Sequence, residues 1–230
     1  SDDVISENFI NSICSKYLET KFDILIINGL VTYKNTASKI INDYIFDFIQ
    51  KKSFIEEALL MGKTGYNCCR VYSKECLDAI DFNSVERLTF TEDLNLYLEI
   101  CKLPNLRVQL LNLELYYYIR KHNLFEKMTT KHVEDALFVI VKRYRMYISI
   151  FNDIFAFSLF NAPVIIDWIY SVFKTKKLNK NEKKEIIRVI FQNKEINTIM
   201  KVACESLKQF SFKNRVKIVF FWEIMRRVYK

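Results

Sequence analysis

Hydrophobic positions follow two different patterns along this chain, and the pattern changes near residue 128. In the first part, runs rich in Ile, Leu, Val and Tyr predict strands at 22–33 and 105–119, with shorter extended chain at 66–72. Apolar residues three to four positions apart predict the intervening helices, at 4–19, 37–50, 53–62, 73–80 and 94–103. Strands that alternate with helices predict an α/β fold, in which helices cover a sheet.

Residue types at two of these helix starts predict N-caps. Ser53 is followed three residues later by Glu56, which is the spacing of a capping box. Thr91 precedes the helix predicted from residue 94 and is expected to cap it.

From Thr129 onward the strand signals stop, and every apolar pattern has helical spacing, so we expect residues 129–230 to be all-helical. The most apolar stretch, residues 150–173, contains polar residues and a proline that interrupt it. It is therefore shorter than the roughly 18 uninterrupted apolar residues of a membrane span, and a buried helical hairpin is expected instead. The predicted organisation is an α/β domain over 1–128 and a helical region over 129–230.

Charge is distributed as unevenly as the hydrophobic pattern. Residues 1–128 carry 15 Lys and Arg against 18 Asp and Glu, whereas residues 129–230 carry 20 against 9. A basic helical region of this kind can serve packing and self-association, or docking on an anionic membrane surface through residues 174–184 and 220–230. Nucleic acid is not an expected partner, because no nucleic-acid-binding signature accompanies the charge.

The six cysteines lack metal-binding spacing, and two of them, Cys68 and Cys69, are adjacent. This arrangement is typical of reduced thiols that pack as small apolar side chains, and it indicates a cytoplasmic protein.

Four features of the first part could carry chemistry. They are the acidic start with Asp2 and Asp3, the segment around Arg70, the pair Glu92 and Asp93, and a tyrosine run that leads into His122. Each also has an ordinary explanation: acidic residues before a helix usually stabilise its N-terminus, tyrosines in strands usually pack, and a terminal acidic pair is usually solvated.

The order and spacing of these features resemble the bacterial family-two glycosyltransferases, which are inverting enzymes of the GT-A fold that use nucleotide-sugar donors. SDDVISENFINSICSKYLETKFDILIINGLV is similar to the segment that begins at that family's D-S-D-D metal motif. Three further blocks follow in the family's order over about 125 residues. They read CCRVYSKECLDAIDF, FTEDLNLYLEI and LYYYIRKHNL.

The resemblance implies a role for each matched residue. Asp2 and Asp3, with His122 as a further contact, would bind Mg²⁺ or Mn²⁺, since hard oxygen ligands suit these ions. Asp93 would be the catalytic base that takes the acceptor's hydroxyl proton, and Glu92 would position the acceptor. Anionic groups of the donor or acceptor would meet the remaining residues, Arg70, Tyr118, Arg120 and Lys121.

The implied function is transfer of a sugar from a nucleotide-sugar donor to a saccharide or lipid-linked acceptor, in surface polysaccharide synthesis at the inner face of the membrane. In that family a nucleotide-binding half of alternating strands and helices precedes the metal motif. We therefore expect residues 1–128 to be the C-terminal part of a GT-A domain, and the 230-residue chain alone to have little or no transferase activity. The alternative is a non-catalytic basic helical module that binds a membrane or a protein partner.

Overall fold

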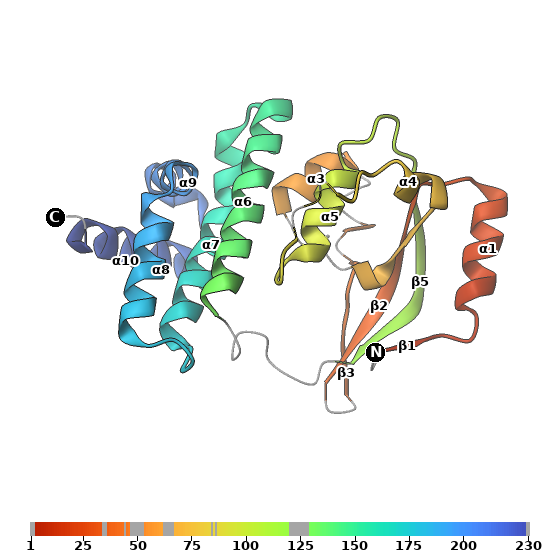
Figure 1. Cartoon of the computed structure of the whole chain (residues 1–230), viewed down its shortest axis with the longest axis horizontal. Helices are drawn as coiled ribbons and strands as arrows, with labels where there is room; N and C mark the ends of the chain where they lie inside the picture. The colour runs from red at the N-terminus through yellow and green to blue at the C-terminus, as the bar shows by residue number, and fades with distance from the viewer. Residues whose placement is uncertain are drawn as a thin grey trace. The chain divides into compact units, whose positions relative to one another are not determined.

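The structure is a computed structural model that describes residues 3–33, 36–43, 45–46, 53–61, 67–83, 85, 87–119 and 129–228. It is mixed α/β, with a sheet and helices in the first part and helices in the second (Figure 1). Contacts between Cα atoms divide the chain into two compact units. We call residues 1–58 with 62–123 the sheet unit, and residues 59–61 with 124–230 the helical unit.

The sheet unit contains the described strands and the shorter helices. Its strands are β1 (Val4–Ile5), β2 (Ile24–Tyr33), β3 (Thr36–Ile40), β4 (Arg70–Tyr72) and β5 (Val108–Ile119). Its helices are α1 (Phe9–Glu19), α3 (Phe54–Met61, whose last turn belongs to the helical unit), η1 (Asn67–Cys69), α4 (Lys74–Asp78) and α5 (Glu92–Ile100).

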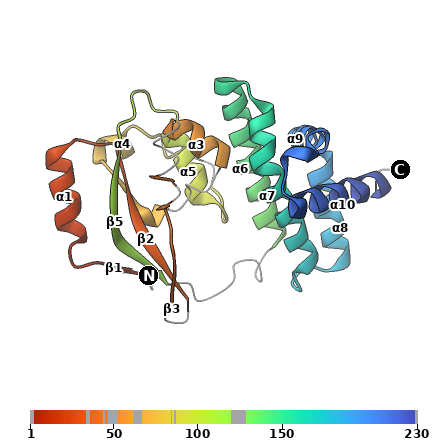
Figure 2. The same cartoon turned by 180° about the vertical axis from the view of Figure 1, so that it is seen from behind.

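Strand β2 is the centre of the sheet. One of its edges pairs with β5 in parallel, and the other pairs antiparallel with β4 near its start and with β3 near its end. Residues Ile24–Ile27 are completely buried, which explains why the sequence shows a continuous apolar run here rather than an alternating one. The short strand β1 pairs antiparallel with the other edge of β5. Helix α1 lies beside β5 in both views (Figures 1 and 2).

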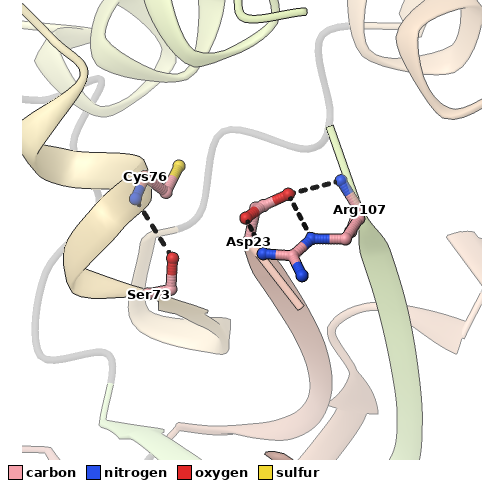
Figure 3. Close-up of polar contacts among 4 residues, drawn as sticks. All are labelled: Asp23, Ser73, Cys76 and Arg107. Atoms are coloured by element: carbon pink, nitrogen blue, oxygen red, sulfur yellow. Dashed lines mark hydrogen bonds and ion pairs between the residues drawn. The ribbon is translucent and has the colours of Figure 1, made fainter. Parts of the chain in front are cut away.

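An ion pair fixes the starts of the two central strands relative to each other. Arg107, just before β5, donates from Nη2 to Oδ1 of Asp23 at 2.7 Å and from Nε to Oδ2 at 3.1 Å (Figure 3). Its backbone N–H also donates to Oδ2 at 2.7 Å. These bonds from Arg107 hold the pKa of Asp23 below its usual value. The register of the parallel pair is thereby anchored at its first residues.

Ser73 caps helix α4 at the same end of the sheet. Its hydroxyl oxygen accepts from the backbone N–H of Cys76 at 3.1 Å (Figure 3). The predicted N-cap Ser53 is confirmed in the same way, since its hydroxyl oxygen accepts from the N–H of Glu56 at 3.1 Å.

Four local predictions for the sheet unit are wrong. Residues 4–5, expected to begin a helix, form strand β1 because they pair with Tyr116 and Tyr117 of β5. Residues 36–40 form strand β3, not the start of a helix, because they pair with the end of β2. Residues 67–69 form the 3₁₀ turn η1, so only 70–72 of the expected extended segment is a strand. Thr91 precedes α5 but does not cap it: its φ is 62°, and its hydroxyl donates to the carbonyl of Phe90 instead.

The helical unit contains only helices among its described residues from Thr129 to Val228, in agreement with the predicted all-helical region. They are α6 (Thr130–Phe151), α7 (Ile154–Lys174), α8 (Lys180–Gln192), α9 (Lys194–Glu205), η3 (Leu207–Gln209) and α10 (Phe212–Val228). Helix α7 contacts each of the other α-helices, so the core of this unit forms around it.

The expected hairpin over residues 150–173 is instead mostly one helix. The chain turns at Asn152, whose φ is 50°, and Asp153 then caps α7 by accepting from the N–H of Ala156 at 2.9 Å. Helix α7 continues through Pro163 to Lys174. It is long and apolar enough to cross a membrane by length and composition, a test that core helices of soluble proteins also pass.

A buried cation holds the end of α3 in the helical unit. Arg143 of α6 is 4% exposed and donates to the carbonyls of Leu59 and Leu60 at 2.9–3.1 Å. Asn161 of α7 also donates to the carbonyl of Leu60, at 2.8 Å. Carbonyls at a helix C-terminus have no partner within the helix, and these two side chains satisfy them.

Candidate functional site

Asp3 stands at the start of β1 and is held by β5. Its Oδ2 accepts from the hydroxyl of Tyr116 at 2.7 Å, and its Oδ1 accepts from the backbone N–H of Ile119 at 3.1 Å. This geometry follows from the antiparallel register, in which Val4 pairs with Tyr117 and Ile5 with Tyr116. Asp3, one residue before Val4, therefore lies at the end of β5. The first and last of the predicted motif blocks are therefore in direct contact.

Asp93 lies in the first turn of α5, where the helix macrodipole favours a negative charge. The side-chain amide of Asn67 donates from Nδ2 to its Oδ1 at 3.1 Å. The hydroxyl of Tyr72 donates in turn to Oδ1 of Asn67 at 2.6 Å, which orients the amide. This chain of hydrogen bonds joins the second and third blocks and fixes the rotamer of Asp93.

The thiol of Cys68 is under the electrostatic influence of three of the blocks. Its Sγ lies 4.0 Å from Sγ of Cys69, and the hydrogen bond between the two lowers the pKa of Cys68. Burial opposes that shift, the charges of Asp3 and Asp93 also raise this pKa, and the charge of Arg70 lowers it. Both carboxylates therefore lie close enough to one thiol to act on it electrostatically, although 90 residues separate them in the chain.

Arg70 is only 6% exposed, and its guanidinium lies 4.7 Å from the ring centroid of Tyr97. This contact is a cation–π interaction inside the sheet unit. Burial raises the pKa values of Tyr72 and Tyr97, and the cation partly offsets both shifts. Arg70 thus contributes positive charge to the site from within the core.

Burial and the hydrogen bond to Asp3 both raise the pKa of Tyr116. Its hydroxyl therefore stays protonated and donates to the carboxylate throughout the neutral range.

Among the other predicted residues, Glu92 is exposed in the first turn of α5 and Tyr118 is half-buried near the end of β5. Tyr118 packs against a core cluster of the sheet unit. Four predicted residues, Asp2, Arg120, Lys121 and His122, lie outside the described part of the chain.

Asp3 is the described residue that the resemblance assigns to a divalent cation, and its carboxylate offers the hard oxygen atoms that Mg²⁺ and Mn²⁺ prefer. Among the described residues, no group of three or more His, Cys, Asp or Glu is arranged to hold a metal. The other two ligands that the resemblance implies, Asp2 and His122, lie outside those residues.

A polar groove of about 420 Å³ lies elsewhere on the sheet unit, between α1 and β5. Its lining comes mostly from α1, including Asn11 and Ser15, with Leu111 and Leu113 from β5. None of the described site residues borders it.

Sequence reasoning missed three residues that the structure places in the site: Asn67, Cys68 and the particular tyrosine that meets Asp3. The signal for Asn67 was weak, since a polar residue before a short strand has many explanations. Strand register could have identified Tyr116, because side chains two residues apart share one face of a strand.

No family model matches the chain, and no curated protein is significantly similar to it.

Proposed function

We propose that the sheet unit is the acceptor side of an inverting, metal-dependent glycosyltransferase that takes a sugar from a nucleotide-sugar donor. The observation that supports this most is that hydrogen bonds join the motif blocks, from Tyr116 to Asp3 and from Tyr72 through Asn67 to Asp93. Asp3, Arg70 and Asp93 come from three separate motif blocks, and all three act on one thiol. Tyr116, from the fourth block, bonds to Asp3.

The proposed fold link is to the GT-A sheet. The acidic motif leads directly into β1, and β1 pairs antiparallel with the strand that carries the tyrosine run. That strand, β5, lies parallel to the buried strand β2. In this proposal the acceptor binds near the N-terminus of α5, and Asp93 is reached from the side of η1.

Asp93 is the proposed catalytic base. The acceptor's hydroxyl oxygen attacks the anomeric carbon, the bond from that carbon to the diphosphate oxygen breaks, and the hydroxyl proton moves to Asp93. Asn67 holds Oδ1 of Asp93, so Oδ2 is the oxygen assigned to the proton. Attack from the face opposite the leaving group inverts the anomeric configuration.

A metal ion at Asp3, if bound, would stabilise the negative charge on the departing diphosphate. The neighbouring residues contribute by orienting the carboxylate that would bind the metal. Tyr116 and the N–H of Ile119 orient the carboxylate of Asp3 by donating to both of its oxygens. We also propose a saccharide or lipid-linked acceptor and a role in surface polysaccharide synthesis, as the resemblance implies.

Titration calorimetry with Mn²⁺ tests the metal part of this proposal without a known donor. The wild-type chain should bind Mn²⁺, and Asp3→Asn should weaken binding at least about tenfold, because the carboxylate is the ligand. Asp78→Asn, which changes an exposed carboxylate of α4, is the matched control and should bind as the wild type does. Equal Mn²⁺ affinity in Asp3→Asn and wild type would refute the assignment of Asp3.

Kinetics test the assignment of the base. The low turnover of a nucleotide sugar expected of the wild-type chain should fall below detection in Asp93→Asn, because a positioned base contributes about 10²- to 10⁴-fold to the rate, while Mn²⁺ binding is unchanged. Turnover at the wild-type rate by Asp93→Asn would contradict the proposed mechanism.

A further inference from the structure

Helix α10 has apolar residues on two opposite sides. Ile218 and Phe221 are at most 2% exposed and face the core of the helical unit, where the ring of Phe221 lies 5.0 Å from that of Phe191. On the other side, four apolar residues are left in solvent. They are Phe212 (80% exposed), Val216 (54%), Val219 (48%) and Phe220 (66%), which we call the outer stripe.

The outer stripe is one continuous face. At 100° per residue, its four side chains fall within an arc of about 100° that lies opposite Ile218 and Phe221. Glu223 follows on the same face and ends the stripe. A helix that needed only to cover the core would carry polar residues on this side, and contiguous exposed apolar surface typically marks an interaction site.

Cations flank the outer stripe. Lys213 and Arg215 are exposed and lie on its two sides, about 100° and about 60° from Phe212 in opposite directions. The guanidinium of Arg215 donates to the carbonyls of Phe210 and Lys208, at 2.7 and 3.3 Å, which brings a third exposed cation, Lys208, to the start of the helix. The stripe is therefore apolar in the middle and positive at its margins.

We propose that the outer stripe of α10 docks on an anionic lipid membrane, with the helix lying in the plane of the interface. An apolar aromatic face bordered by Lys and Arg is the pattern of interfacial helices, in which the apolar side chains enter the acyl boundary and the cations meet lipid phosphates. The inference is independent of the transferase proposal.

A second copy of the chain fits the same stripe less well. Residues 129–230 carry 20 Lys and Arg against 9 Asp and Glu. Two outer stripes packed face to face would bring the cationic margins of both copies together, and like charges at short distance oppose association. An anionic lipid surface supplies the complementary charge.

Co-sedimentation of the full chain with lipid vesicles tests the proposal. The wild type should bind vesicles that contain about 30% phosphatidylglycerol much more tightly than vesicles of phosphatidylcholine alone, and added salt should weaken that binding. Phe212→Ser with Phe220→Ser should lower the partition coefficient at least about tenfold, because both side chains lose their transfer into the interface. Lys213→Glu should lower it about fivefold or more at low salt.

The matched control replaces exposed apolar residues of other helices, Ile150→Ser with Phe155→Ser, and should bind as the wild type does. Circular dichroism of each variant checks that the helices remain intact. Equal binding by the outer-stripe variant and the wild type, or equal binding to both kinds of vesicle, would overturn the proposal. It would also be overturned if the chain ignored vesicles but formed dimers that the outer-stripe variant abolished, since the partner would then be a second copy.

Discussion

Replacing Gly29 with alanine should destabilise the sheet unit, even though the residue lies within a strand where alanine is usually tolerated. Gly29 belongs to β2, between β5 and the turn η1. A Cβ atom at this position would lie 2.8 Å from Sγ of Cys69, 2.8 Å from the carbonyl oxygen of Tyr116 and 3.2 Å from Cδ1 of Ile41. The first two distances are shorter than ordinary carbon contacts, so a neighbour would have to move.

Neither close neighbour can move easily. Cys69 is fully buried, and the carbonyl of Tyr116 is part of β5, whose residues pair with both β2 and β1. Overpacking of a well-packed site costs about 1–3 kcal/mol, and we take the upper end because one obstacle is backbone. Alanine regains about 1 kcal/mol through the lower entropy of its unfolded chain. The expected net loss is therefore about 2 kcal/mol.

Urea unfolding monitored by circular dichroism measures this loss, provided that the transition of the sheet unit is resolved. Cys69→Ala should partly rescue Gly29→Ala, because it removes the sulfur but leaves the carbonyl of Tyr116 in place. The double variant should thus show a favourable coupling of about 1 kcal/mol. Unchanged or greater stability in Gly29→Ala would refute the packing described around the site.

Three further predictions concern single side chains. Asn67→Ala should lower the free energy of unfolding in urea by about 1–2 kcal/mol. Adding Asp93→Ala to this variant should cost about 1 kcal/mol less than Asp93→Ala costs in the wild type, because the hydrogen bond between the two side chains is already lost. The pKa of Asp23 is lowered by its ion pair, so its stabilisation is present above the ordinary value of 3.8 and is lost as pH falls through the lowered pKa. The wild type should therefore lose stability below about pH 4 more steeply than Asp23→Asn, as acid titrations of unfolding would show. Arg143→Met should cost about 3 kcal/mol, because the carbonyl of Leu59 loses its Arg143 donors and that of Leu60 keeps only Asn161 of its two side-chain donors. Arg145→Met, at an exposed ion pair, should cost less than about 1 kcal/mol in the same assay.

Elements with strong local patterns could be predicted from the sequence. The run Ile24–Ile27 is buried on both faces, and a continuous aliphatic segment is what such a strand requires. The helices after Thr129 follow from apolar spacing, and the α6 start is stabilised by a capping box between Thr129 and His132.

Other elements could not be predicted because distant partners decide them. Residues 36–40 carry helical spacing with the segment that follows, but pairing with β2 makes them a strand. Thr91 has the residue type of an N-cap, yet its left-handed backbone turns the hydroxyl toward the preceding carbonyl. In both cases tertiary context outweighs local preference.

In the candidate site, too, residue identities could be predicted from the sequence, whereas contacts between distant residues could not. Asp3, Asp93 and Arg70 could be identified as candidate site residues from motif order. That the charges of all three act on Cys68 could not be predicted, because it depends on how η1 lies beside β2 and β5. The tyrosine that meets Asp3 is decided by the register of β1 with β5, which a shift of one residue would change.

Paramagnetic broadening by Mn²⁺ is the most direct test that Asp3 and Asp93 belong to one site. In nuclear magnetic resonance spectra of the wild-type chain, Mn²⁺ should selectively broaden the backbone amide signal of Cys68 and the side-chain amide signal of Asn67, which holds Asp93. Asp3→Asn should abolish this broadening, because the ion would lose its ligand. Signals of Cys68 and Asn67 that stay sharp with the wild type, or broaden equally in Asp3→Asn, would contradict a shared site.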